Sequence, residues 1–86
     1  MMTGAQVRAA RALAGIDQRE LADHAGLSVP TIQRMEASDG VVRGNVDSLM
    51  KLVAAFEKLG IDLIIASESG GRGVRFKSAS PKGRRR

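Results

Sequence analysis

The sequence lacks cysteine, tyrosine and tryptophan, and its 86 residues include one histidine and two phenylalanines. Without cysteine, neither a disulfide nor a thiolate metal site can form, which fits a reducing compartment. His24 has no second histidine as a partner and is expected at the surface. So few aromatic rings also argue against recognition of single-stranded nucleic acid by base stacking. We therefore expect no enzyme, no cofactor and no metal.

Long apolar segments are absent as well. The longest apolar run near the C-terminus, residues 63–66, is far shorter than a membrane span. Near the N-terminus, Arg8 and Arg11 interrupt the region in which a signal peptide needs an apolar stretch. The length is sufficient for one domain with a small core. These features predict a cytoplasmic protein that does not enter a membrane.

Positive charge is concentrated at the C-terminus. Residues 1–71 contain seven Lys/Arg and nine Asp/Glu, whereas residues 72–86 contain seven Lys/Arg and no acidic residue. The net charge of +5 therefore arises from the C-terminal segment. A basic segment attracts nucleic acid of any sequence. Basicity alone thus does not show that the rest of the chain binds DNA, and the argument depends on the helix pattern.

Residues 18–36, QRELADHAGLSVPTIQRME, have the pattern of two short helices joined by a tight turn. Gly26 suits the position after a helix, where the backbone often adopts a positive φ. Ser28 is a good N-cap for the second helix, and Pro30 falls in its first turn, where a missing N–H costs little. Apolar residues at helical spacing mark the inner faces: Leu21, Ala22 and Ala25 in the first helix, Ile32 and Met35 in the second. This pattern predicts a helix-turn-helix, whose second helix enters the DNA major groove.

This stretch resembles the helix-turn-helix of the lambda-repressor-like, or Xre, family of bacterial and phage regulators. The residues that carry the resemblance are Gln18, Leu21-Ala22, Gly26-Leu27-Ser28, Thr31-Ile32 and Glu36. The resemblance extends over residues 3–60. The later segment GIDLIIASESGGRGVRF is similar to the strand-like extension of some small members. The resemblance implies a DNA-binding regulator encoded by a bacterium or phage, located with the nucleoid in the cytoplasm.

Caps and apolar spacing predict the remaining elements. Thr3 and Asn45 cap a first and a fourth helix, and Asp17 with Glu20 forms a capping box for the second. The inward stripes are Val7, Ala10 and Ala14 in the first helix, and Leu49, Leu52, Val53 and Phe56 in the fourth, widened by Met50 and Leu59. Alternation at residues 61–66 and 73–77 predicts a hairpin. We predict a mostly α fold: a four-helix lambda-repressor-like domain at residues 1–60, a small C-terminal β-hairpin at residues 61–77, and a disordered basic tail at residues 78–86.

The resemblance places the DNA contacts on and around the helix at residues 29–37. Gln33 can bond adenine, and Arg34 can reach guanine or a phosphate, whereas Val29 and Pro30 can only touch thymine methyls. Gln18 opens the preceding helix, where a phosphate can bind. The predicted DNA-binding residues are Gln18, Ser28, Val29, Pro30, Thr31, Gln33, Arg34 and Arg43.

Several of these residues also have a purely structural interpretation. Gln18, Arg34 and Arg43 can be solvated surface residues. Val29 can pack against the preceding turn, and Ser28 can do no more than cap its helix. The resemblance further implies a structural ion pair between Arg11 and Glu36, which links the first helix to the end of the third.

The first strand contains a candidate dimer surface. Ile61, Leu63 and Ile65 alternate to one face, so Ile64 lies on the other face with nothing obvious in this short chain to cover it. We therefore predict a dimer interface at Leu63, Ile64 and Ile65. A symmetric homodimer would present two reading helices to half-sites one helical turn apart. One helix alone makes too few contacts with DNA to give a useful specificity.

The sequence favours a repressor that binds double-stranded DNA, and two rival functions stay open. In the first, the protein is an antitoxin whose sheet or tail neutralises a toxin, with DNA binding as autoregulation. In the second, the basic tail binds RNA or the ribosome. A co-purifying partner would identify the first rival, and deletion of the tail would separate the second.

Overall fold

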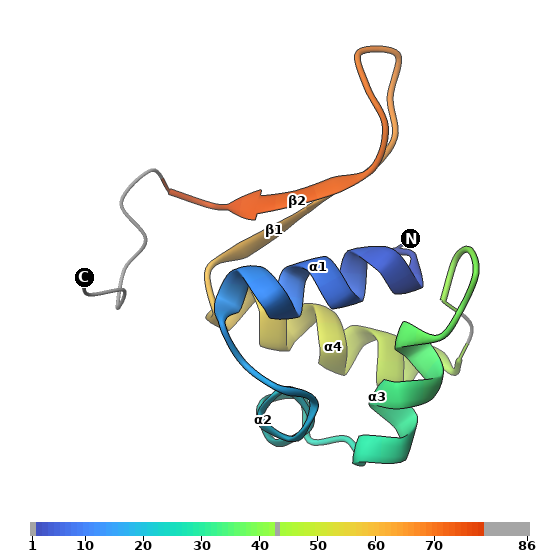
Figure 1. The fold of residues 1–86 in the computed structure, drawn as a ribbon, viewed down its shortest axis with the longest axis vertical. Coiled ribbons are helices and arrows are strands. Elements are labelled where there is room, and N and C mark those ends of the chain that lie inside the picture. Colours follow the sequence, from blue (N-terminus) through green and yellow to red (C-terminus); the bar gives the residue numbers. More distant parts are fainter. Residues whose placement is uncertain (1, 43, 79–86) are drawn as a thin grey trace.

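The computed structural model of the protein describes residues 2–42 and 44–78. It contains four helices followed by an antiparallel hairpin, which confirms the predicted fold class (Figure 1). The elements are α1 (Gly4–Ala14), α2 (Gln18–Ala25), α3 (Val29–Glu36), α4 (Val46–Lys58), β1 (Ile61–Ile64) and β2 (Gly73–Phe76). Arg43 and residues 79–86, which include most of the predicted tail, lie outside the described residues.

Each helix begins at the side-chain cap that the sequence predicts. The oxygens of Thr3, Asp17, Ser28 and Asn45 each accept a hydrogen bond from the backbone N–H three residues later. These bonds satisfy donors that a helix cannot satisfy itself. The helix boundaries are therefore determined locally, by residues at the ends of each helix.

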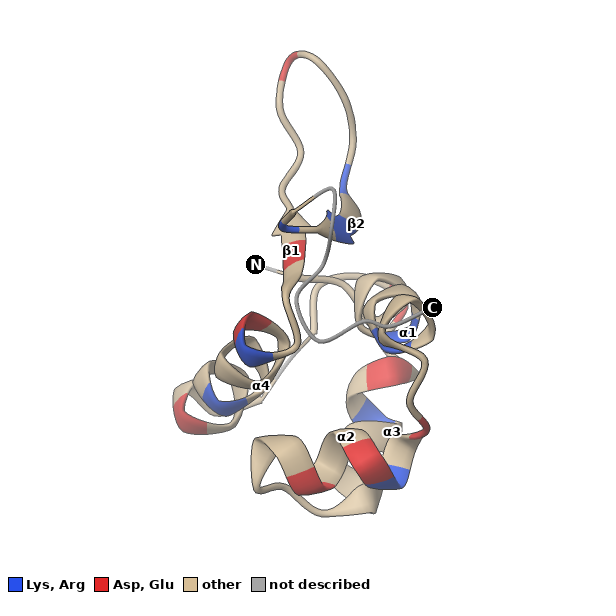
Figure 2. Cartoon of the chain, turned by 90° about the vertical axis from the view of Figure 1, so that its left-hand side faces the viewer, with Lys and Arg blue, Asp and Glu red and all other residues tan. Residues whose placement is uncertain are grey.

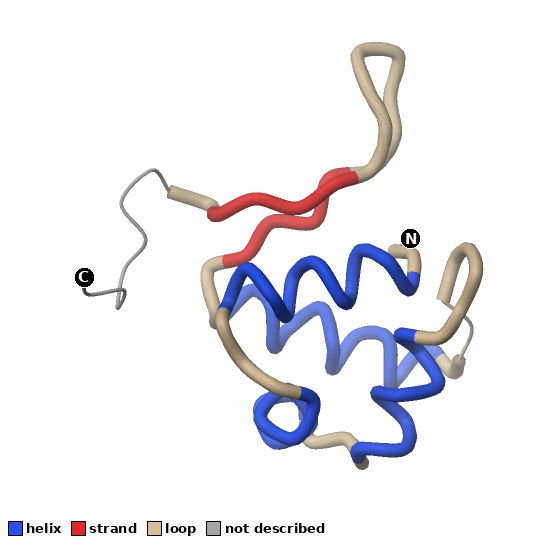
Figure 3. Tube along the Cα trace, in the orientation of Figure 1, coloured by secondary structure: helices blue, strands red, loops and turns tan. Residues whose placement is uncertain are grey.

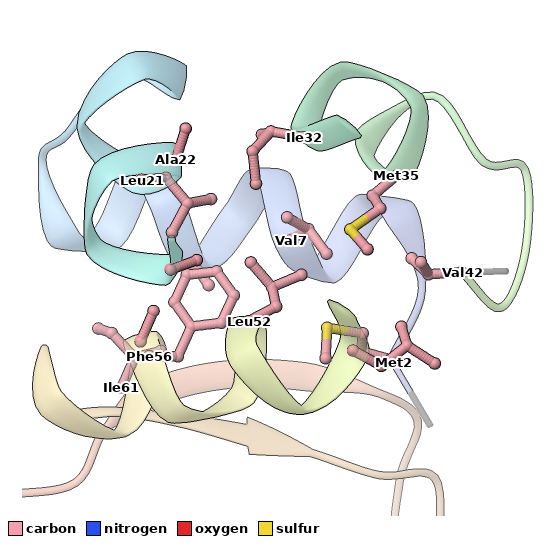
Figure 4. Packing of buried hydrophobic residues seen from close by; sticks show 14 residues of the cluster. Met2, Val7, Leu21, Ala22, Ile32, Met35, Val42, Leu52, Phe56 and Ile61 are labelled. Atoms are coloured by element: carbon pink, nitrogen blue, oxygen red, sulfur yellow. The ribbon is translucent and has the colours of Figure 1, made fainter. Parts of the chain in front are cut away.

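The core lies between the helices and the hairpin (Figure 4). Its largest fully buried side chains are Phe56, Leu21, Ile32, Leu52, Ile61 and Val7. The hairpin contacts α1, and β1 also contacts α4, while α2 and α3 pack on each other. Seen as a tube, the hairpin lies on one side of α1, and α2 and α3 lie on the other (Figure 3). Every element thus contributes to one small hydrophobic core.

Gln6 attaches the hairpin to α1 through buried hydrogen bonds. Its Nε2 donates to the carbonyl oxygens of Ile64, at 2.8 Å, and of Gly73, at 3.0 Å. Its Oε1 accepts a hydrogen bond from the backbone N–H of Thr3 at 2.9 Å. A buried amide is costly unless its donors and acceptor are satisfied, and here both ends are used. Gln6 therefore links the start of α1 to both strands.

Two details of the predicted apolar pattern are wrong. The first strand ends at Ile64 rather than Ala66, so Ile65 lies beyond the last ladder pair and is 66% exposed. Met50 does not widen the buried arc of α4, because it is 55% exposed. One residue of helix rotates a side chain by about 100°, which turns Met50 away from the buried Leu49.

The start of α1 packs against the end of α3 without space for a side chain. A Cβ atom on Gly4 would lie 2.5 Å from the carbonyl oxygen of Ser38 and 2.9 Å from those of Met35 and Glu36. The Gly4 N–H donates to the carbonyl oxygen of Gly40 at 3.2 Å. This close approach fixes the start of α1 against the end of α3.

We expect Gly4→Ala to lower the free energy of unfolding by about 2 kcal/mol, because three backbone oxygens would have to move. Urea denaturation followed by circular dichroism measures the change. Gly71→Ala is the matched control, since its added methyl group meets nothing within 4 Å. Equal stability of the two variants would contradict the close packing of α1 on α3.

Candidate nucleic-acid interface

The exposed face of α3 is the main candidate surface. Pro30, Gln33, Arg34 and Ala37 are exposed and recur at helical spacing, whereas Ile32, Met35 and Glu36 are buried. The turn before α3 has the predicted geometry, because Gly26 adopts φ 67°. This conformation suits glycine and allows α3 to leave α2 abruptly. The buried stripe holds α3 in place and presents the other side to solvent.

Three polar side chains form a chain of hydrogen bonds along the first turns of α3. The hydroxyl oxygens of Ser28 and Thr31 lie 2.9 Å apart. Arg34 donates from Nη2 to Thr31 Oγ1 at 3.3 Å. Ser28 Oγ also accepts from the backbone N–H of Thr31, so it caps α3 as well. The guanidinium of Arg34 is therefore drawn along the helix towards Thr31.

A cleft of about 220 Å³ separates α3 from the start of α4. Its lining residues are Thr31, Arg34, Met35, Gly44, Asn45 and Ser48. Arg34 brings a positive charge to this cleft, and two hydroxyl groups and an amide provide further polar atoms. Such groups make contacts to the sugar-phosphate backbone in protein–DNA complexes. The cleft thus extends the exposed face of α3 with polar groups of the kind that contact a DNA backbone.

The carboxylate of Glu36 fixes the other end of α3. Arg11 donates to it from Nε at 2.7 Å and from Nη2 at 3.2 Å, and Gln18 Nε2 donates at 3.0 Å. The Glu36 side chain is only 5% exposed, whereas that of Arg11 is 24% exposed. The hydrogen bond with Glu36 raises the pKa of Arg11, with a further contribution from the negative charge of the carboxylate. The network joins α1, α2 and α3.

The structure separates the sequence candidates into different environments. Gln33 is exposed, and its side chain makes no hydrogen bond to the described residues. Val29 is half-buried and packs against the core. Gln18 uses one of its amide hydrogens in the bond to Glu36. The predicted pair of Arg11 and Glu36 is present, whereas Arg43 lies outside the described residues.

Two residues of α1 that support α3 and the hairpin were missed in the sequence. Arg8 donates from Nη1 to the backbone carbonyl of Glu36 and so satisfies an oxygen at the end of α3. Gln6 forms a capping box with Thr3, and the Thr-x-x-Gln spacing was the available signal for it. No comparable signal identified Arg8, because its partner is a backbone atom far along the chain.

Among the described residues, no three His, Asp or Glu side chains gather as metal ligands would. His24 is exposed on α2. No helix in the same part of the chain is long and apolar enough to cross a membrane.

A family model described as a helix-turn-helix domain matches residues 3–59, about two thirds of the chain. The chain therefore belongs to this helix-turn-helix family, and this membership indicates a DNA-binding regulator. The matched segment runs from the cap of α1 to the end of α4 and thus stops before the hairpin. No curated protein matches the chain.

We expect Glu36→Gln to lower the free energy of unfolding by about 2 kcal/mol, because it removes the buried negative charge that pairs with Arg11. Asp62→Asn is the matched control, since Asp62 pairs with Arg75 and Lys77 and is more exposed than Glu36. Its cost should stay below about 1 kcal/mol. Thermal unfolding of both variants measures the difference. Equal costs would show that the Glu36 network does not hold α3.

Proposed function

We propose that the protein is a sequence-specific regulator of transcription that binds double-stranded DNA, with α3 in the major groove. The observation that carries this proposal is the exposed face of α3, which stands on a helix fixed by Ile32, Met35 and Glu36. An α-helix fits the width of the major groove. The resemblance to lambda-repressor-like, or Xre, proteins supports the same use of α3. Binding would repress a gene by occluding its promoter.

Within this proposal, Gln33 is the principal base reader. Its amide is exposed and is not engaged by the described residues, so it can form two bonds with adenine. Pro30 can touch a thymine methyl group, whereas Val29 is half-buried and has less surface to offer. Arg34 can reach guanine, or a phosphate from its position at the cleft. The protein would thus read few bases directly.

Backbone contacts would position α3 in the groove. Thr31 and Ser28 are at the start of α3, and Ser28 already serves as its cap. Gln18 begins α2, where helix N–H groups favour an anion. Arg43 belongs to the same proposal on the grounds of the sequence alone. Contacts of this kind fix register and orientation without reading bases.

We further propose that the regulator acts as a homodimer at two half-sites, because one α3 helix offers a small number of base contacts. Selection of bound fragments from random double-stranded DNA tests this directly. The expected product is a pair of related half-sites about one helical turn apart. Recovery of unrelated sequences would contradict specific reading, and recovery of a single half-site would contradict the dimer.

An antitoxin is the second candidate function. The observation that favours it is the position of the hairpin, which lies on the opposite side of α1 from α3 (Figure 1). A protein partner could therefore bind the hairpin while α3 contacts DNA. Expression together with the neighbouring genes, followed by purification, tests this function. A toxin that stays bound to the hairpin would support it, and binding that survives removal of the hairpin would oppose it.

We expect Gln33→Ala and Arg34→Ala each to weaken binding to the selected DNA by roughly 1–3 kcal/mol, because each removes a contact without touching the core. Fluorescence anisotropy on the selected DNA and on random DNA measures the two affinities. For Gln33→Ala the loss should be confined to the selected DNA. An equal loss on both DNAs for Arg34→Ala would assign that residue to a phosphate.

Arg75→Ala is the matched control for Arg34→Ala. It removes the same charge from the hairpin, on the opposite side of α1 from α3. This variant should leave the preference between selected and random DNA unchanged. If neither Gln33→Ala nor Arg34→Ala changes that preference, α3 is not the reading helix.

Deletion of residues 78–86 should weaken binding to random DNA and flatten its dependence on salt. The segment carries Lys82 and three arginines, and each lost phosphate contact lowers the log–log slope by about 0.9. The preferred sequence should stay the same, because base reading belongs to α3. Titrations at several salt concentrations measure both properties. The RNA-binding rival would be supported instead if the full chain bound RNA without preferring any DNA sequence and the truncated protein lost RNA binding.

A further inference from the structure

Large apolar side chains are exposed together on α4 and just after β1. Val46 is 72% exposed, Met50 55% and Ile65 66%. Val46, Met50 and Val53 are four and three residues apart, so they share one side of α4. We call Val46, Met50, Val53, Leu63 and Ile65 the α4–β1 surface. Apolar groups gathered in this way often mark an interface.

The surface includes a shallow groove as well as protruding side chains. The groove has a volume of about 200 Å³ and is lined by Met2, Gln6, Val53, Leu63 and Ile65. The amide of Gln6 is already bonded to carbonyl oxygens of the hairpin. The groove therefore offers an apolar wall and no free polar group. It is smaller than the usual binding site for a drug-sized molecule.

We propose that the α4–β1 surface binds a second copy of this chain. The groove suits one apolar side chain, and the same surface carries Met50 and Ile65 in exposed positions beside it. In a two-fold interface, a residue of one copy meets a different residue of the other, and the reverse contact forms by symmetry. The exposed apolar side chains of one copy can enter the groove of the other, and the reverse contact then forms by symmetry, so a single surface meets this requirement.

Charge is compatible with self-association. The described residues contain nine Lys/Arg and nine Asp/Glu, so their net charge is zero. Both signs occur along α4 (Figure 2), and Lys51 pairs with Asp47 at 3.3 Å. Near the end of α4, Lys77 pairs with Glu57 at 3.3 Å. Two copies could therefore associate without repulsion between surfaces of like charge. A strongly charged partner, in contrast, would find no surface of opposite charge here.

The position of the surface connects pairing to DNA reading. Val46 follows Asn45, which lines the cleft beside α3, whereas Ile65 directly follows β1 and lines the groove. Pairing through this surface would thus set the separation of two α3 helices. This consequence rests on the proposed function. Ile64, the third residue of the interface expected from the sequence, does not line the groove and lies on the other face of β1.

Adjacent isoleucines provide a matched pair of variants. Ile65→Lys places a charge on the α4–β1 surface, and Ile64→Lys places the same charge one residue earlier, on the opposite face. Met50→Lys tests the α4 part of the surface. Sedimentation equilibrium of the full chain gives the dissociation constant of the dimer, and circular dichroism confirms that each variant folds.

We expect the wild type to be dimeric, and Ile65→Lys and Met50→Lys each to raise the dissociation constant about 30-fold or more, the loss typical of a central interface residue. Ile64→Lys should leave the constant unchanged. A monomeric wild type would overturn the proposal, and so would a dimer that survives both Ile65→Lys and Met50→Lys. Dissociation by Ile64→Lys alone would move the interface to the outer face of the hairpin.

Single cysteines provide a second measurement, because the chain has none of its own. Ile65→Cys and Met50→Cys should each give covalent dimers with a short bis-maleimide reagent. Ala37→Cys, exposed at the end of α3, should not. Equal cross-linking at all three positions would reject the α4–β1 surface even if a lysine variant had failed to fold.

DNA binding separates this inference from the proposed function. Monomeric Ile65→Lys should keep its preference for the half-site sequence and lose the tighter binding to two half-sites. If the wild type dimerises through the surface but shows no preference for any DNA sequence, the function is wrong and the interface stands. If DNA preference is present while Ile65→Lys and Met50→Lys still dimerise, the interface is wrong and the function stands.

Discussion

The orientation of α3 depends on one buried carboxylate. Glu36 is almost fully buried and accepts hydrogen bonds from Arg11 and Gln18, which belong to the two preceding helices. A charge in this position requires partners, since its desolvation is otherwise unfavourable. The network therefore ties α1 and α2 to the end of α3. The outward direction of Gln33 and Arg34 follows from that arrangement.

The shortness of α2 and α3 explains why such a constraint is needed. Each has eight residues, and an isolated helix of this length is marginal in water. Caps at Asp17 and Ser28 define where these helices begin, but packing determines whether they persist. Ile32 and Met35 supply the apolar contacts of α3, and Glu36 adds the directional ones. Both kinds of contact keep the exposed face of α3 pre-organised, as its proposed role in reading DNA requires.

Local signals explain what could be predicted from the sequence. Thr3, Asp17, Ser28 and Asn45 act on N–H groups three residues away, so the start of every helix could be read directly. Apolar spacing likewise identified most of the core, because it depends on helix geometry alone. Family resemblance supplied the pairing of Arg11 with Glu36, which no local pattern contains.

Contacts between distant segments could not be predicted in the same way. A side chain at position 4 is excluded by carbonyl oxygens more than thirty residues later in the chain. The burial of the Gln6 amide likewise depends on carbonyl oxygens of the hairpin. The Thr-x-x-Gln spacing marks Gln6 as part of a capping box, but nothing in the neighbouring sequence indicates the distant partners of Gly4 or Gln6. The exposure of Met50 and Ile65 was missed for a related reason. An apolar residue next to a buried one extends the apolar pattern of the sequence, but its side chain points in a different direction from that of its neighbour.

The attachment of the hairpin has a consequence for how the protein folds. The helices begin with bonds three residues apart, whereas the bond from Gln6 to Gly73 spans 67 positions. Closing such a span costs chain entropy before any contact compensates for it. We expect the helices to assemble first and the hairpin to dock last. Amide hydrogens of β1 and β2 should then exchange with solvent when the hairpin alone opens, whereas those of α1 and α4 should exchange only when the whole domain unfolds.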